Sequence, residues 1–107
     1  MKPTLARAIE YAAGQALNAR LLGDRPPALT MAAGTALTTA IYRNALHSIG
    51  KGAAKEIGTV LPTEAQTEAI GATIATRLLD LARKEAPLTD AALYELGARS
   101  VKEVRNG

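Results

Sequence analysis

The chain has no cysteine, phenylalanine or tryptophan, and His47 is its only histidine among 107 residues. Without cysteine it can form no disulfide and has no thiol nucleophile or zinc-binding thiolate. A hydroxyl nucleophile would have a single imidazole to serve as its base. Glu64 and Glu68 share a helix face, but a di-metal bundle site would need a histidine three residues after a glutamate, and none is there. We therefore expect no catalytic residue, no metal and no cofactor.

The chain also lacks a long apolar run, and we expect no secretory leader. Its longest uncharged stretch, residues 26–42, contains two prolines and four threonines in seventeen residues, whereas a membrane span needs about 20 predominantly apolar residues. This composition favours a buried helix over a membrane span. Arg7, Glu10 and Arg20 interrupt the apolar stretch that a secretory signal would need after Met1. We expect a cytoplasmic protein.

Large side chains are scarce, which limits the core of the single domain that a chain of residues 1–107 predicts. Alanine occurs 23 times and contributes one methyl group, whereas a buried aromatic ring supplies about 150 to 250 Å². Close helix packing or association with other chains can stabilise so thin a core. We thus expect a homo-oligomer or a protein partner. Coding bias in a GC-rich genome is an alternative source of the alanine, and the excess of arginine over lysine fits it.

One pattern recurs in three parts of the chain: a glycine is followed three and seven residues later by leucine or isoleucine. At 3.6 residues per turn these offsets fall on one narrow helix face, so they predict a seam at which helices approach closely. The seam residues are Gly14, Leu17 and Leu21; Gly34, Leu37 and Ile41; and Gly71, Ile74 and Leu78. Four residues before the three glycines stand Glu10, Thr30 and Thr67, so one end of the seam is polar. Three interpretations of this polar end are open: the solvated mouth of the bundle, a buried hydrogen-bonded layer, or a ligand site.

Capping signals and periodicity divide the chain into four helices. They run from Thr4 to Gly23, from Pro27 to at least Ile49, from Thr63 to Lys84, and from Thr89 onward. The second helix either kinks at Gly50 and Gly52 or continues to Val60, while Thr63 and Gln66 predict a capping box. No stretch alternates with a period of two, which argues against strands. We expect an all-α fold: a small antiparallel bundle of three long helices plus a shorter C-terminal helix, with the second helix central, between the first and third.

Four basic residues at intervals of four, Arg43, His47, Lys51 and Lys55, are the best candidates for a binding site, with Tyr42 beside them. On a continuous helix they form one cationic side that could bind anions, with apolar residues on the opposite side. Residues 1–55 have seven basic and two acidic side chains, whereas residues 56–107 have six and eight. This segregation suits nucleic acid, an anionic ligand such as a mononucleotide or cyclic nucleotide held by Tyr42 or Tyr11, an acidic protein or a second copy. The alternative is an ordinary solvated helix side.

Residues 88–105 offer an alternative, a helix-turn-helix in which Gly97 is the turn. Arg99, Lys102 and Arg105 would then face DNA, but only ten residues follow Gly97 and Glu103 lies among them. A plain fourth helix fits better.

The sequence thus predicts a non-catalytic helical bundle that works by self-association or by docking on a macromolecular partner. A virion or mobile-element component, or an inhibitor of another protein, would have this character. The alternative is a small anion-binding module for nucleic acid or a nucleotide that uses the basic helix face.

Overall fold

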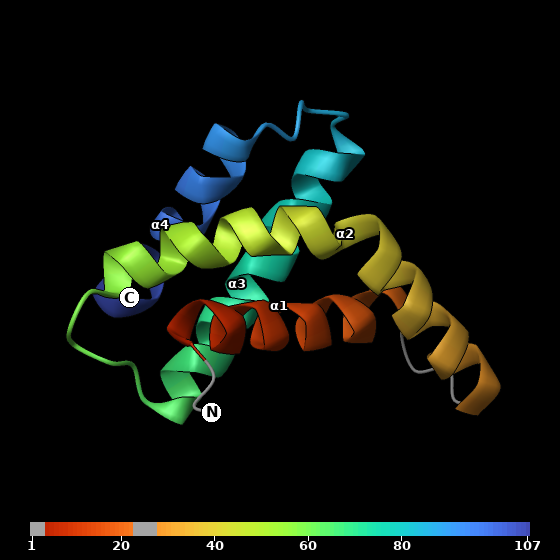
Figure 1. The fold of residues 1–107 in the computed structure, drawn as a ribbon, viewed down its shortest axis with the longest axis horizontal. Helices are drawn as coiled ribbons and strands as arrows, with labels where there is room; N and C mark the ends of the chain where they lie inside the picture. Colours follow the sequence, from red (N-terminus) through yellow and green to blue (C-terminus); the bar gives the residue numbers. More distant parts are fainter. Residues whose placement is uncertain (1–3, 23–27) are drawn as a thin grey trace.

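The computed structural model describes the backbone of residues 4–22 and 28–107, and the side chains of residues 4–20 and 42–107. Every regular element in these ranges is an α-helix: α1 (Leu5–Leu22), α2 (Ala28–Ile57), α3 (Glu64–Arg83) and α4 (Asp90–Asn106) (Figure 1). The expected all-α bundle with a shorter C-terminal helix is confirmed. None of these helices contains a stretch both long and apolar enough to cross a membrane. Residues 23–27, which contain the expected end of the first helix at Gly23 and the expected start of the second at Pro27, lie outside the described residues.

Three helices begin at the threonines that the sequence indicates. The Thr63 hydroxyl accepts a hydrogen bond from the Gln66 backbone N–H at 3.1 Å, and the Thr63 N–H donates to Gln66 Oε1 at 2.9 Å. This reciprocal pair confirms the capping box. The hydroxyls of Thr4 and Thr89 likewise accept bonds from backbone N–H groups three residues later, satisfying donors that a helix start leaves unpaired.

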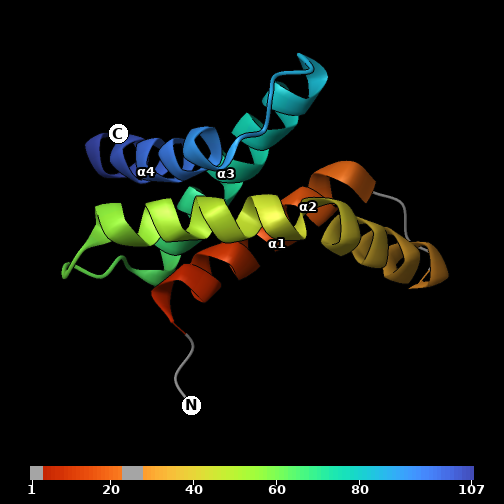
Figure 2. The ribbon, with the colours of Figure 1, turned by 45° about the horizontal axis from the view of Figure 1, so that its top comes forward.

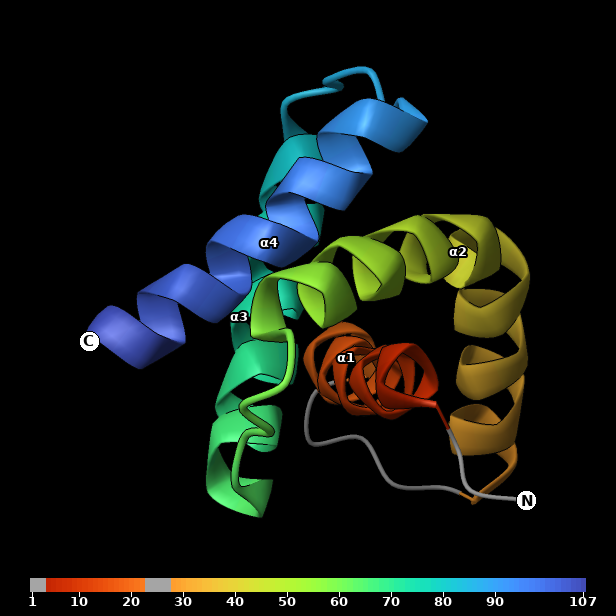
Figure 3. The same cartoon turned by 60° about the vertical axis from the view of Figure 1, so that its left-hand side comes forward.

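α2 continues without interruption through Gly50 and Gly52 and ends at Ile57. Gly58 follows with a positive φ of 64°, the left-handed conformation that commonly ends a helix. The ribbon bends in its amber-to-yellow part, before the yellow-green part that contains the two glycines (Figures 1 and 3). Of the two alternatives for this helix, continuation past Gly50 and Gly52 is therefore the one observed, and it stops three residues short of Val60.

The four helices form two antiparallel pairs, α1 with α2 and α3 with α4. Between the pairs, α2 packs most extensively on α4, and α1 packs on α3, while α2 and α3 scarcely touch. The expectation that α3 would pack against α2 is wrong, because α4 occupies that position. Ser48 contacts Asp90, and Glu56, further along α2, contacts Lys102, further along α4. The two helices therefore run in the same direction, side by side (Figure 2).

The core lies between the two pairs and is made of aliphatic side chains. Its fully buried members of largest volume are Ile9, Leu17, Ile49, Ile70, Ile74, Leu78 and Val101. Ser100 is the one buried polar residue recorded among the described side chains, and its hydroxyl donates to the Leu96 carbonyl at 2.8 Å. Among the described side chains the core thus holds no unpaired hydroxyl.

Glycines mark the closest approaches between helices. A Cβ added at Gly71 would lie 2.7 Å from the Ala12 carbonyl carbon, and one at Gly50 would lie 2.8 Å from the Ala6 oxygen. Added Cβ atoms at Gly52 and Gly97 would overlap the backbone oxygens of Tyr94 and Ile49, respectively. Every one of these contacts is with the backbone of a neighbouring helix. Each glycine therefore permits an approach that alanine would prevent.

The predicted seam coincides with these close approaches at one glycine. Gly71 lies against α1, and Leu17, Ile74 and Leu78 are fully buried. Gly14 is different, because a Cβ there would make only an ordinary contact of 3.9 Å with Leu46 Cδ1. The remaining seam residues, Leu21, Gly34, Leu37 and Ile41, lie outside the described side chains. Gly50, Gly52 and Gly97, which the sequence suggested as interruptions, are instead packing positions inside helices.

Candidate binding face

The second half of α2 presents the basic residues Arg43, His47, Lys51 and Lys55, here called the basic row. Because α2 is unbroken, successive members rise by about 6 Å and rotate by about 40°, so the row extends about 18 Å along one side. All four residues are exposed. On the opposite side of α2, Leu46, Ile49, Ala53 and Ile57 are buried in the core. The fold thus fixes which way the basic row faces.

Two carboxylates lie next to the outward side of α2. Glu10 of α1 places Oε1 2.9 Å from His47 Nδ1, and its side chain is only 21% exposed. Asp90, the first residue of α4, accepts a hydrogen bond from the Ser48 hydroxyl at 3.4 Å. Within the part of the chain whose side chains are described, Arg43, Lys51 and Lys55 form no salt bridge. The basic row therefore keeps most of its positive charge facing solvent.

The cations of α3 and α4 are arranged differently, because most of them contact partners within the molecule. The recorded salt bridges are Arg77–Glu103, Lys84–Asp80, Arg99–Glu95 and Lys102–Glu56. Arg105 reaches across from α4 and donates to the carbonyls of Ile57 and Val60, where α2 ends. Most of these charges have a partner within the molecule, whereas Arg43, Lys51 and Lys55 of the basic row have no salt bridge among the described side chains.

The helix-turn-helix alternative is excluded by the course of α4. Gly97 lies in the middle of a continuous helix, pressed against Ile49 of α2, and makes no turn. The three cations that would have faced DNA, Arg99, Lys102 and Arg105, contact groups of α4 and of the end of α2 instead. The packing requirement at Gly97 explains a glycine that resembled a turn signal.

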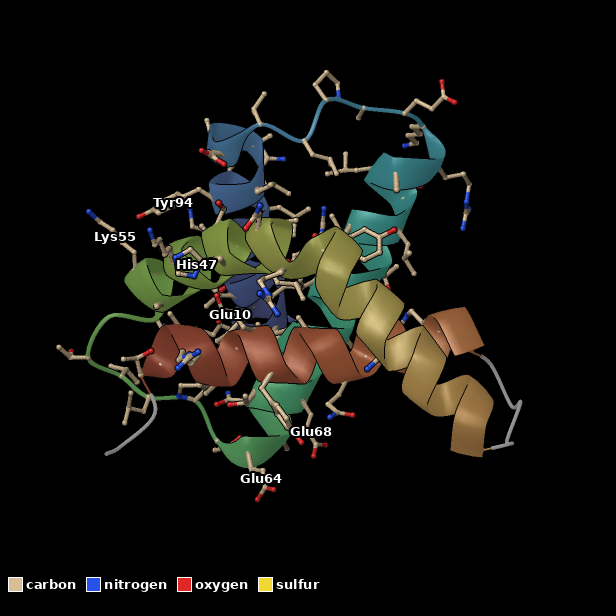
Figure 4. All side chains as sticks on the ribbon, turned by 45° about the vertical axis from the view of Figure 1, so that its right-hand side comes forward. Glu10, His47, Lys55, Glu64, Glu68 and Tyr94 are labelled. Atoms are coloured by element: carbon tan, nitrogen blue, oxygen red, sulfur yellow. The ribbon has the colours of Figure 1, made fainter. Side chains whose placement is uncertain are left out.

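An open cleft runs along the exposed side of α1, next to the basic row. Arg43, His47 and Lys51 of α2 line it, as do Glu64 and Glu68 of α3, and Tyr11 of α1 lines it too. Figure 4 shows His47 and the two glutamates on opposite sides of α1. One wall of the cleft is thus cationic and the other anionic.

The polar end of the predicted seam opens into this cleft. Glu10 and Thr67 both line it, and the Thr67 hydroxyl donates to the Thr63 carbonyl at 3.0 Å. Of the three interpretations offered for these residues, the solvated mouth of the bundle agrees with their position in an open cleft. Thr30 lies outside the described side chains.

The tyrosines are distributed differently from what the sequence suggested. Tyr42, expected beside the basic residues, is partly buried and packs against the core. Tyr11 is 70% exposed and lines the cleft. Tyr94 is 38% exposed, its backbone rests on Gly52, and Figure 4 shows its side chain near Lys55. No local signal indicates that Tyr94 belongs here, because its position depends on the packing of α4 against α2.

No protein family, curated protein or solved structure matches the chain. The site is therefore interpreted from its own residues.

The acidic wall has a structural role of its own. Glu64 is the first residue of α3, where a carboxylate interacts favourably with the positive end of the helix dipole. In the described ranges no three His, Asp or Glu side chains are grouped so that they could hold a metal ion. This face thus presents four exposed basic residues along α2, and the exposed Tyr11 lines the cleft next to them.

Proposed function

We propose that this protein is a non-catalytic interaction module that docks on an anionic macromolecule through the basic row of α2. The observation that carries the proposal is the contrast in charge pairing: Arg43, Lys51 and Lys55 have no salt-bridge partner among the described side chains, whereas most cations of α3 and α4 do. Uncompensated charges of one sign on a rigid face create a field that attracts and orients a partner of opposite sign.

The surroundings of His47 support a binding role over catalysis. His47 is the only imidazole in the chain, and Nδ1 contacts Glu10. The adjacent hydroxyl, that of Ser48, donates to Asp90 on another helix. A hydroxyl nucleophile needs a base within hydrogen-bond reach, and here the imidazole and its neighbouring hydroxyl are directed to different carboxylates.

A charge-reversal experiment tests the proposal. Lys51→Glu with Lys55→Glu changes the basic row, and Lys84→Glu with Arg99→Glu gives the same change in net charge on α3 and α4. The probes are fluorescently labelled oligothymidine and labelled polyglutamate, titrated by fluorescence anisotropy over a range of salt concentrations. We expect the wild type to bind at least one probe more weakly as salt rises, and the first variant to lose about ten-fold or more in affinity while the second loses much less. Equal loss in both variants, or no binding by the wild type, would contradict the proposal.

A second candidate function, self-association, is favoured by the acidic wall. Glu64 and Glu68 lie across α1 from the basic row. In a dimer with a two-fold axis, the basic row of each copy would therefore face the glutamates of the other. Light scattering coupled to size exclusion tests this candidate. Self-association predicts a dimer that Glu64→Lys with Glu68→Lys converts to a monomer. A wild type that is monomeric at every concentration removes it.

A further inference from the structure

We infer that the macromolecule bound by the basic row is a single-stranded nucleic acid, whose phosphates lie along α2 and whose bases stack on Tyr11 and Tyr94. This inference rests on the proposed docking function and names its partner. The new observation is the placement of two exposed tyrosines, from two different helices, at the two edges of one cationic face.

The first edge is formed by α1. Tyr11 lines the same cleft as Arg43 and His47 and exposes 70% of its surface. The second edge is formed by α4, where Tyr94 rests on Gly52 and lies near Lys55. The basic row therefore has one ring in the cleft that Arg43, His47 and Lys51 line, and another near its Lys55 end.

The fold leaves Tyr11 70% exposed and buries Tyr94 only in part, at 38% exposed. Neither Tyr11 nor Tyr94 belongs to the buried core, whereas Tyr42 packs against it. Leaving a large apolar ring in water forgoes the stabilisation that burial would give. Aromatic rings next to cations are what proteins that bind single strands use, because each base has a π face that stacks regardless of sequence.

The same geometry disfavours the other polyanions. In a duplex the bases are already stacked on one another, so the tyrosines would have no free base to contact. A recognition helix must also enter the major groove, whereas the second half of α2 is flanked by α1 and α4. An acidic protein segment would satisfy the cations but provides no systematic use for a ring at both edges.

The acidic wall limits the path of the strand. Glu64 and Glu68 stand on the far side of α1 from His47, and they would repel phosphates placed beyond Tyr11. Glu10 contacts His47 and lowers the net charge at that point of the row. The attractive path is thus confined to the outward side of α2, between the two tyrosines.

Single substitutions of the rings test the inference. Tyr11→Ala and Tyr94→Ala are compared with Tyr11→Phe and Tyr94→Phe, using labelled oligothymidine, a labelled DNA duplex of equal length and labelled polyglutamate as probes. Because the chain has no tryptophan, quenching of tyrosine fluorescence by unlabelled oligothymidine gives a second readout of stacking. Thermal melting of each variant checks that it is folded.

We expect each alanine variant to lose about five-fold or more in affinity for oligothymidine, and each phenylalanine variant to retain wild-type affinity. The slope of log affinity against log salt should stay the same in all four variants, since no cation is removed. Tyr11→Ala alone decides the test if Tyr94→Ala does not fold.

The outcomes separate the inference from the function on which it rests. Unchanged oligothymidine affinity in the folded alanine variants, or equal or tighter binding of the duplex or of polyglutamate, would overturn the single-strand assignment and leave docking on an anionic partner standing. If the wild type binds none of the three probes, the proposed function falls with it.

Discussion

The second half of α2 has two surfaces with opposite requirements. On its flanks, Gly50 lies against the backbone of α1 and Gly52 against that of α4, and neither position has room for a Cβ. On its outward side, the long side chains of the basic row extend into solvent. One helix thus carries close backbone packing and exposed positive charge within a few residues of each other. Substitutions on the two surfaces should therefore have separable effects, the first on stability and the second on binding.

The largest effect is expected at the α2–α4 contact. In Gly97→Ala the new methyl group would overlap the Ile49 carbonyl oxygen and lie 2.9 Å from the Ala53 nitrogen. Both atoms are backbone, so relief requires the helices to move apart and the core to loosen. We expect a loss of about 3 kcal/mol or more in the free energy of unfolding, at the upper end of overpacking effects, measured by urea denaturation.

Gly14→Ala is the matched control, because it makes the same chemical change inside a helix. The added methyl group meets only Leu46 Cδ1 at 3.9 Å, and alanine is favoured over glycine in a helix interior by up to about 1 kcal/mol. The variant should be at least as stable as the wild type. A loss at Gly14 comparable to that at Gly97 would show that the close approaches are not where the structure places them.

Substitutions of the cations should change the free energy of unfolding less than substitutions of the packed glycines do. Arg105 donates to the carbonyls of buried Ile57 and exposed Val60 at the end of α2, so Arg105→Ala removes two charged hydrogen bonds and should cost about 1 kcal/mol. Lys55→Ala removes a charge of the basic row, which has no salt bridge in the described structure, and should leave thermal stability unchanged. Comparable destabilisation by both would mean that the basic row also serves the fold.

Local signals in the sequence predicted much of this fold. Thr63 and Gln66 form a capping box because both partners lie within one turn of the same helix, and Thr89 caps α4 for the same reason. Such interactions need no knowledge of the rest of the chain. The basic row was predicted on the condition that α2 continues through its glycines, and the structure meets that condition.

Long-range pairings could not be predicted in the same way. Gly52 and Gly97 are 45 residues apart, and each alone resembles a helix breaker because glycine lowers helix propensity. Only the α2–α4 contact, in which Gly52 lies against Tyr94 and Gly97 against Ile49, reveals them as packing positions. The same contact places Tyr94 near the basic row, whereas Tyr42 packs against the core. The sequence therefore indicated the cations of the site but not its aromatic border.

The smallest effect on stability is expected at Glu85. Unlike the packed glycines, this residue matters for its own backbone conformation and not for a close approach between helices. Glu85 has a φ of 54°, a left-handed conformation that costs a residue with a Cβ about 1 kcal/mol or more. It follows α3 in a Schellman motif, with hydrogen bonds from the Ala86 N–H to the Leu81 carbonyl and from the Glu85 N–H to the Ala82 carbonyl. Glu85→Gly should therefore raise the free energy of unfolding by about 0.5 kcal/mol, part of the gain being offset by the greater freedom of glycine in the unfolded chain.

Gly58→Ala, at the end of α2, places a Cβ on a positive φ and should change stability in the opposite direction. If both substitutions shift the urea midpoint the same way, backbone conformation does not control how these two helices end.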